Sequence, residues 1–337
     1  MIEATALREV REWGANLPDL RAQDISDVGI GADDNVYLLY RNPTFIVVCT
    51  PAGEVVRTIG EGILGPRAHG VTVTADGVVY VVDSGAHRIR ILAPDGSVIR
   101  EFGSGPTNPA FAGKWTGDYA DNVDRAYPPF CLPTRIAVSR AGEIFVSDGY
   151  GNCRIHHFTP DGDLVHSWGE PGTGPGQFNT PHDIFLDKRG RILVCDREND
   201  RIQVFDIGGR LLEQWTDLRR PQGVVQGPDG LYYVAEGAWR PGHVSRVHGT
   251  VSPAPSRVSV LADGGAVVER LGEEAREDGE PGAPHRFIAA HGITIDSAGG
   301  VYVTEVSFSV SQRFPQSAGH VAASKFCRDQ DAEMAPR

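Results

Sequence analysis

The 337 residues of this chain include 44 acidic and 32 basic side chains, and the resulting net charge of −12 argues against a nucleic-acid partner because no cluster of cations is available to neutralise phosphates. Hydrophobic residues make up 40% of the sequence, yet the longest apolar runs, such as 45–49, are far too short to cross a bilayer. The first five residues lack the basic and then apolar segments of a secretory signal. We therefore expect a soluble cytoplasmic protein with no membrane partner, and the sequence is compatible with a monomer.

One segment recurs six times along the chain. Each copy runs from a polar opening residue through a short apolar strand, a tight turn and a second apolar strand, and ends 14 positions later in an acidic or aromatic residue. The copies open, in chain order, at Ser26, His69, Thr134, His182, Gln222 and His291. Their second strands end at Tyr40, Asp83, Asp148, Asp196, Glu236 and Glu305. The shared spacing indicates that one structural unit is built six times.

Several copies continue into a third and a fourth strand, as at 88–92 and 98–103, separated by an Asp-Gly hairpin turn. Four antiparallel strands per unit are typical of a propeller blade, so the sequence predicts an all-β, six-bladed β-propeller that forms a single domain over 1–337. The sixth copy is clear only through 301–305, whereas 7–14 resembles a fourth strand that lacks the first three. We expect this N-terminal strand to complete blade six and close the ring, which removes open sheet edges.

The five cysteines are an odd number with no paired spacing. Most fall within the strand patterns, so we predict buried free thiols rather than disulfides or thiolate ligands. They are Cys49, Cys131, Cys153, Cys195 and Cys327.

Three of the six opening residues are histidines on alternate copies: His69, His182 and His291. The first strand of each propeller blade lines the central channel, so the opening residues should form one ring at one mouth of that channel. Three imidazoles about 120° apart match the facial ligands of a catalytic zinc site that leaves one position open. Imidazole also suits other divalent transition metals, and channel histidines that only bind trapped water are the alternative interpretation.

Residues 15 or 16 positions after an opening should return to the same mouth. These positions hold Arg41, Tyr150 and Arg197. Guanidinium groups beside a metal site favour a small anionic substrate, and a tyrosine near such cations is a candidate base. The alternatives are an ion pair of Arg197 with Asp196 or Glu198 and a purely structural Tyr150.

Two long intervals between repeat segments contain insertions, at 104–130 and 237–256. The first joins blade 2 to blade 3, and the second joins the second and third strands of blade 5. Both connections should lie on the histidine face, where they could wall or cover a pocket.

The stretches 130–134, 144–152, 174–178, 181–184 and 196–205 resemble the NHL-repeat propellers and, more narrowly, the peptidyl-α-hydroxyglycine α-amidating lyases, with Asp196-Arg197-Glu198-Asn199 as the most specific motif. The resemblance covers all six blades and is densest over 130–205. It implies zinc held by the three histidines, a catalytic Tyr150, and substrate contacts from Arg41 and Arg197. It further implies cleavage of the C–N bond of a carbinolamide to an aldehyde such as glyoxylate and a free amide.

This sequence departs from the family at several positions. Gly151 and Val204 stand where the family has disulfide cysteines, and Ala289 stands where it has a methionine on the substrate side. Gly292 replaces an acidic residue that helps to bind a structural calcium ion, so the resemblance gives no support for calcium here.

Three functions remain open from the sequence. The first is a metal-dependent carbon–nitrogen lyase, and the second is a metal-hydroxide hydrolase or hydratase acting on a lactone, amide or nitrile. The third is a non-catalytic propeller that serves as an interaction platform, because fold does not fix function.

Overall fold

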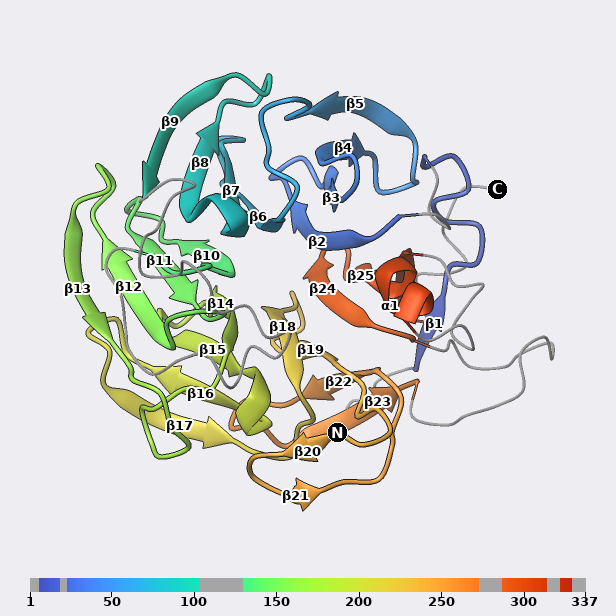
Figure 1. The fold of residues 1–337 in the computed structure, drawn as a ribbon. Helices are drawn as coiled ribbons and strands as arrows, with labels where there is room; N and C mark the ends of the chain where they lie inside the picture. Colours follow the sequence, from blue (N-terminus) through green and yellow to red (C-terminus); the bar gives the residue numbers. More distant parts are fainter. Residues whose placement is uncertain (1–5, 19–22, 104–129, 273–286, 314–321, 329–337) are drawn as a thin grey trace.

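The computed structural model describes residues 6–18, 23–103, 130–272, 287–313 and 322–328, and these form six four-stranded antiparallel sheets arranged in a ring (Figure 1). The first three blades consist of β2 (Ile25–Ile30), β3 (Val36–Tyr40), β4 (Phe45–Cys49) and β5 (Val55–Ile59); β6 (Ala68–Val73), β7 (Val79–Asp83), β8 (Arg88–Leu92) and β9 (Val98–Gly103); and β10 (Arg135–Val138), β11 (Ile144–Asp148), β12 (Arg154–Phe158) and β13 (Leu164–Trp168). The next two consist of β14 (Pro181–Leu186), β15 (Ile192–Asp196), β16 (Arg201–Phe205) and β17 (Leu211–Trp215); and β18 (Pro221–Gln226), β19 (Tyr232–Glu236), β22 (Arg257–Leu261) and β23 (Val267–Leu271). The six-bladed all-β prediction is confirmed.

Blade six joins the two ends of the chain. Its strands run in the order β24 (Ala290–Ile295), β25 (Val301–Glu305), β26 (Ala323–Arg328) and β1 (Leu7–Glu9). The pairing of Leu7 with Arg328 sets the register of the outermost pair. The N-terminal strand therefore completes blade six, as the sequence predicted, and β26 is the third strand that the repeat pattern left unidentified.

In blades 2 to 6, the acidic residue that ends the second strand anchors the loop that enters the same blade. The carboxylate of Asp83 accepts the backbone N–H of Gly65 at 3.0 Å, and Asp196 accepts that of Asn179 at 2.7 Å. Glu305 accepts the N–H groups of Ile288 and Ala289 at 2.7 and 2.8 Å. The acidic end of the repeat thus satisfies backbone donors that burial would otherwise leave unpaired.

The hydrophobic core lies between the blades. One cluster, for example, joins Tyr37 and Leu39 of blade 1 to Val71 and Val81 of blade 2, and every blade contributes to such clusters. The five cysteines are free, and four of them are buried among these side chains, as expected from the sequence. Within the described ranges, we find no helix with the length and apolar character needed to cross a membrane.

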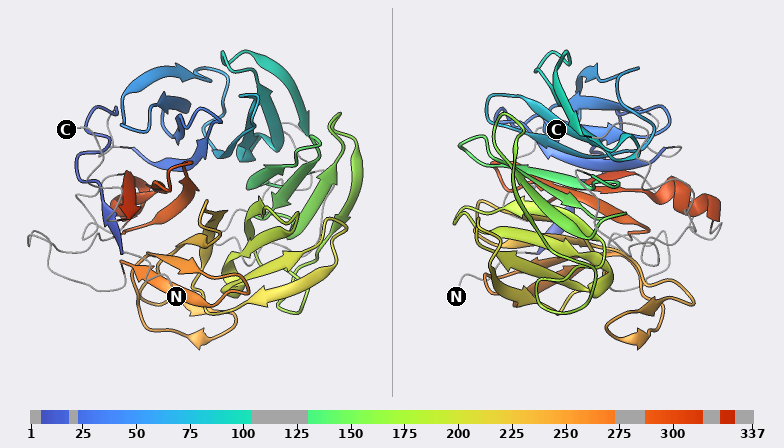
Figure 2. Two further views of the ribbon diagram at one scale, coloured as in Figure 1. Left: turned by 180° about the vertical axis from the view of Figure 1, so that it is seen from behind. Right: turned by 60° about the vertical axis from the view of Figure 1, so that its left-hand side comes forward.

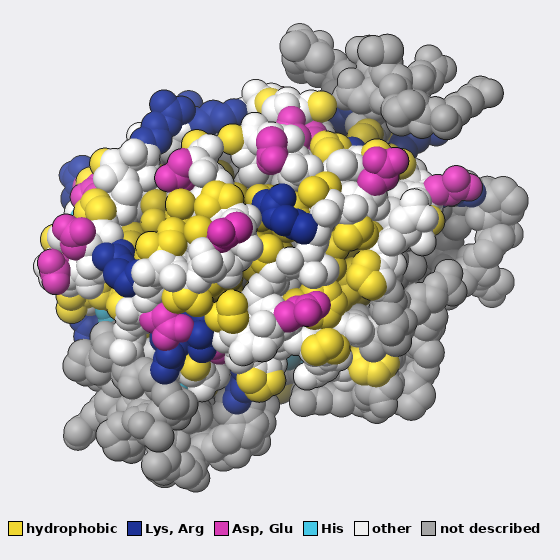
Figure 3. Space-filling view, turned by 90° about the horizontal axis from the view of Figure 1, so that it is seen from above, with side chains coloured by type: hydrophobic (Ala, Val, Ile, Leu, Met, Phe, Trp, Pro, Cys, Tyr) yellow, Lys and Arg dark blue, Asp and Glu magenta, His cyan; other side chains and the backbone are white. Residues whose placement is uncertain are grey.

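Three outer strands, β5, β9 and β13, begin with exposed aliphatic pairs, such as Val98 and Ile99 on β9. On the rim that Figure 3 shows, hydrophobic side chains alternate with charged ones rather than forming one continuous patch. Two further elements lie outside the six sheets. The short helix α1 (Ser307–Arg313) and the hairpin of β20 (Val244–Ser245) and β21 (Gly249–Thr250) project from one face of the ring (Figure 2).

Candidate active site

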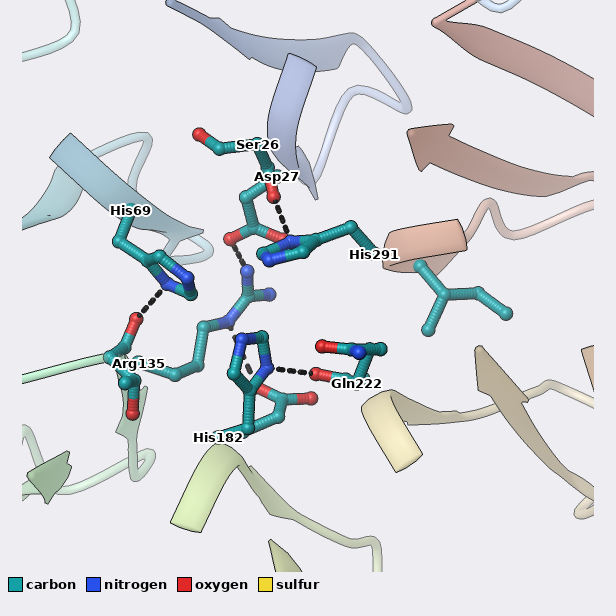
Figure 4. A pocket seen from close by; sticks show the side chains of 11 residues that line it. Ser26, Asp27, His69, Arg135, His182, Gln222 and His291 are labelled. Atoms are coloured by element: carbon teal, nitrogen blue, oxygen red, sulfur yellow. Dashed lines mark hydrogen bonds and ion pairs between the residues drawn. The ribbon is translucent and has the colours of Figure 1, made fainter. Parts of the chain in front are cut away.

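Three buried imidazoles converge at one mouth of the central channel (Figure 4). His69, His182 and His291 come from the first strands of blades 2, 4 and 6, and their ring centroids lie 4.7 to 4.9 Å apart. One ring nitrogen from each lies within 4.8 Å of the other two. The repeat spacing predicted this ring, and the structure brings the three side chains together.

The neighbouring blades fix the orientation of each imidazole. The Nδ1 atoms lie 2.8 Å from the carbonyl oxygen of Thr134, 2.7 Å from that of Gln222 and 2.6 Å from that of Ser26. A carbonyl only accepts, so each Nδ1 carries the proton and each Nε2 keeps a lone pair. Each histidine thus uses the backbone carbonyl of the opening residue of the next blade as its hydrogen-bond acceptor.

The protein keeps these imidazoles neutral. Burial is the main cause of a lowered pKa in all three, and it lowers the pKa of His291 to about 3 with a further contribution from Arg41. The pKa values of His69 and His182 also lie well below the ordinary value, because burial is reinforced by the neighbouring histidines and arginines. Neutral imidazole is the form that binds metal ions.

Tyr150 points its hydroxyl into the histidine ring. Its oxygen lies 2.7 Å from Nε2 of His69 and 2.8 Å from Nε2 of His182. A phenol has one proton to donate, so it cannot satisfy both lone pairs, and His291 offers a third. Three nitrogen acceptors and a phenol oxygen around one point fit a bound cation, and three neutral histidines are a zinc-type donor set.

Both predicted arginines lie beside this ring. The Arg197 guanidinium lies 5.5 Å above the ring of Tyr150, and its Nε donates to Glu198 at 2.7 Å. Arg197 therefore forms the ion pair with Glu198 that was the alternative interpretation, and it also lies at the site beside Tyr150. Asp196 pairs instead with Arg201 at 2.8 Å. Arg41 faces the same cavity as Tyr150.

Two cavities meet above the histidines, and both are lined by Arg41, Tyr150 and Ser309. The larger lobe, of about 290 Å³, reaches His291, and the smaller lobe, of about 210 Å³, reaches His69. Ser309 belongs to the first turn of α1. Its backbone N–H donates a hydrogen bond to the carboxylate of Asp24 at 3.0 Å, which holds this turn in place. The sequence reasoning did not identify α1 as a wall, because it lies outside the repeat and carries no motif.

The predicted insertions can be placed only in part. Gly237, Ala238, Arg240 and Ser256 of the second insertion line the larger lobe, and Ser245 bonds Asp200 of blade 4 at 2.6 Å. This insertion therefore lines the same cavity as His291. The first insertion, 104–130, falls outside the described residues except for Phe130 at its end.

A family model described as "6-bladed beta-propeller" matches residues 131–237, and one described as "NHL repeat" matches 66–92. The six-bladed fold of the chain agrees with the first description, and 66–92 are similar to the NHL repeat. The chain is 49% identical over 82 residues to peptidylglycine alpha-amidating monooxygenase of Rattus norvegicus, which is 23% of this chain and 8% of that protein. It is 34% identical over 147 residues to peptidyl-alpha-hydroxyglycine alpha-amidating lyase 1 of Drosophila melanogaster, or 36% of this chain and 26% of that one. The matched segments thus span less than a third of either relative.

A solved streptogramin B lyase is similar to this propeller along nearly its whole length. The match covers 96% of this chain and 98% of that chain, with a TM-score of 0.56 and 16% sequence identity. At this identity the likeness concerns the fold alone.

A second charged layer lies directly below the histidines of this propeller. The residues that follow the six openings are Asp27, Gly70, Arg135, Asp183, Gly223 and Gly292. The guanidinium of Arg135 contacts the carboxylate of Asp27, and its Nε lies 3.3 Å from that of Asp183 (Figure 4). The sequence reasoning missed this layer, although the signal is present one position after each opening.

The charged layer does not fit the calcium ion that the family resemblance associates with position 292. A Cβ at Gly292 would lie 2.6 Å from Oγ1 of Thr304 and 2.7 Å from Oδ1 of Asp27, so an acidic side chain has no room there. Arg135 already places a positive charge between the two carboxylates. The positive charge between Asp27 and Asp183 is therefore the guanidinium group of Arg135 rather than a calcium ion.

Proposed function

We propose that this propeller is a metal-dependent carbon–nitrogen lyase that acts on a small anionic α-hydroxyglycine-type substrate and releases an aldehyde acid and an amide. The observation that carries the proposal is the convergence of three neutral imidazoles on the Tyr150 hydroxyl, with Arg41 and Arg197 on the same cavity. The names of the rat and fly relatives support amidating-lyase chemistry for this site.

The Nε2 atoms of His69, His182 and His291 would hold the metal, with zinc first among the divalent transition metals that accept three imidazoles. When bound there, zinc supplies a Lewis acid that polarises an oxygen of the substrate. Their Nδ1–H donors, fixed on backbone carbonyls, hold the three rings in the orientation that this role requires.

The side chains around the ring account for the remaining steps. Arg41 and Arg197 present guanidinium groups that fit the substrate carboxylate. Tyr150, in its phenolate form, takes the proton of the substrate hydroxyl. The oxygen electron pair then forms the aldehyde C=O, the C–N bond breaks with its electrons moving to nitrogen, and that nitrogen receives the proton as the amide leaves. The products together contain the atoms of the substrate, so no oxidant, reductant or water is consumed.

The test combines metal analysis with turnover. Wild type, His182→Ala and a control, His166→Ala on the outer strand of blade 3, are purified with zinc present and dialysed. We expect about one transition metal per chain in wild type and control, and much less in His182→Ala. We also expect aldehyde release from N-butanoyl-α-hydroxyglycine only in the two metal-loaded proteins. Wild-type protein without bound metal, or equal turnover in all three, would contradict the proposal.

A further inference from the structure

The larger lobe of the cavity is lined by more positive charge than a single carboxylate requires. Its described lining includes no aspartate or glutamate. Its cationic lining residues are Arg41, Arg197, Arg220 and Arg240. The smaller lobe, in contrast, includes Asp24 together with Arg41 and Arg67. Charge is therefore concentrated on the side of the site toward blade 5.

One buried acid behind the wall holds two of these guanidinium groups in place. Glu198 accepts from Nε of Arg197 at 2.7 Å and from Arg220 at 2.8 and 3.2 Å. Burial alone would raise the pKa of Glu198, but Arg220 and Arg197 outweigh it and hold that pKa well below its ordinary value. One carboxylate thus orients two arginines and cancels only one of their charges.

Arg220 also connects this wall to the insertion of blade 5. It donates to the carbonyl oxygen of Ala238 at 3.2 Å, and Arg240 follows two residues later on the same segment. Arg220 adopts a φ of +43°, a conformation that costs energy for a residue with a side chain. The surrounding bonds hold Arg220 in this position, so its guanidinium group is fixed at the far wall.

The remaining wall of the larger lobe is small and apolar. Ala289, Ala290, Val306 and Val310 line it. The lobe has a volume of about 290 Å³, just below the roughly 300–1,000 Å³ of pockets for drug-sized ligands. The lobe therefore suits a short apolar chain rather than an extended peptide.

We propose that Arg220 and Arg240 form a second anion subsite, and that the substrate class is an N-acyl-α-hydroxyglycine whose short acyl chain ends in a second carboxylate. The inference rests on the proposed function for the position of the first carboxylate at Arg41 and Arg197. The apolar wall accommodates the acyl chain, and the far arginines receive its terminal anion. The cleaved product is then the amide of a short dicarboxylic acid.

Two matched substrates test the subsite. N-succinyl- and N-butanoyl-α-hydroxyglycine have the same chain length and differ by a terminal carboxylate in place of a methyl group. We expect wild type to prefer the succinyl compound by about tenfold or more in kcat/KM, because a hydrogen bond to a charged group corresponds to a factor of that size. In Arg240→Gln this ratio should fall toward one. In Arg246→Gln, an exposed arginine of the same insertion, the ratio should stay as in wild type. Arg220→Lys keeps the charge beside Glu198 and should give an intermediate ratio.

Calorimetric titration with N-succinylglycine and N-butanoylglycine separates this inference from the proposed reaction. Both compounds lack the hydroxyl group and cannot be cleaved. An Arg240-dependent preference for N-succinylglycine without cleavage of either hydroxylated compound would support the subsite and overturn the lyase. Cleavage of both hydroxylated compounds with ratios near one, and equal binding of both glycine compounds, would overturn the subsite and leave the lyase standing. A ratio that is unchanged in Arg240→Gln would also overturn it.

Discussion

Replacement of Arg135 by methionine tests the charged layer below the histidines. The guanidinium of Arg135 contacts Asp27 and lies 3.3 Å from Asp183, and both acids are buried. Methionine keeps most of the side-chain volume and removes the charge, so two buried carboxylates lose their cation. Removing one partner of a buried ion pair costs about 3–5 kcal/mol.

The expected change in melting temperature follows from the size of the chain. With an unfolding entropy of roughly 2.1 cal/mol/K per residue, 337 residues convert that loss into a decrease in Tm of about 4–7 °C. Calorimetry at pH 8 is the assay. Arg140→Met, at an exposed turn of the same blade, is the matched control and should melt within about 1 °C of wild type.

The pH dependence gives an independent signature of the same charge. Burial already raises the pKa of Asp183, and Arg135 opposes this shift. Without Arg135 the folded-state pKa rises further above the unfolded value, so stability is lost as pH rises and is regained as pH falls and the carboxyl group is protonated. The difference in Tm between wild type and Arg135→Met should therefore be smaller at pH 5 than at pH 8. Equal Tm values at pH 8, or a deficit that does not vary with pH, would refute the assignment of Arg135 as the internal cation.

Three further predictions concern the site itself. Tyr150→Phe should retain bound metal and lose turnover of N-butanoyl-α-hydroxyglycine by about 10²-fold or more, whereas Tyr80→Phe should retain both; wild-type rates in Tyr150→Phe would favour hydrolysis by a metal-bound hydroxide. Arg41→Gln should lower kcat/KM by about tenfold or more with bound metal unchanged, and an equal loss in the control Arg57→Gln would argue against a specific role. Because burial lowers the folded-state pKa of His291 to about 3, the metal-free protein should lose stability as pH falls from 6.5 toward 3, and His291→Asn should lose less over that range in urea unfolding.

Sequence reasoning recovered the features that the repeat itself encodes. The 14-residue spacing between an opening residue and the end of its second strand places His182 and Arg197 on one face, because antiparallel strands return the chain to the end where it began. The acidic ends of those strands were visible as a pattern, but their purpose was not. Only the structure shows Asp196 and Glu305 accepting backbone N–H groups from the entering loops.

The features that were missed depend on contacts between blades. Arg135 lies 108 residues after Asp27 and 48 residues before Asp183, so no local pattern links the three charges. Helix α1 and Arg240 line the cavity from segments that replace ordinary blade connections, and no repeat predicts their course. The pairing of Arg220 with Glu198 likewise joins two blades across a single buried carboxylate.

The closure of blade six has a consequence for the order in which the site assembles during synthesis. A nascent chain that has reached blade 5 already contains His69 and His182, but His291 and the strand β26 that pairs with β1 are still to be made. Only two imidazoles are then in place, too few for a site that depends on three. Under the proposed function, the metal site is complete only after β24 has been made, and a chain that stops after blade 5 lacks the third ligand.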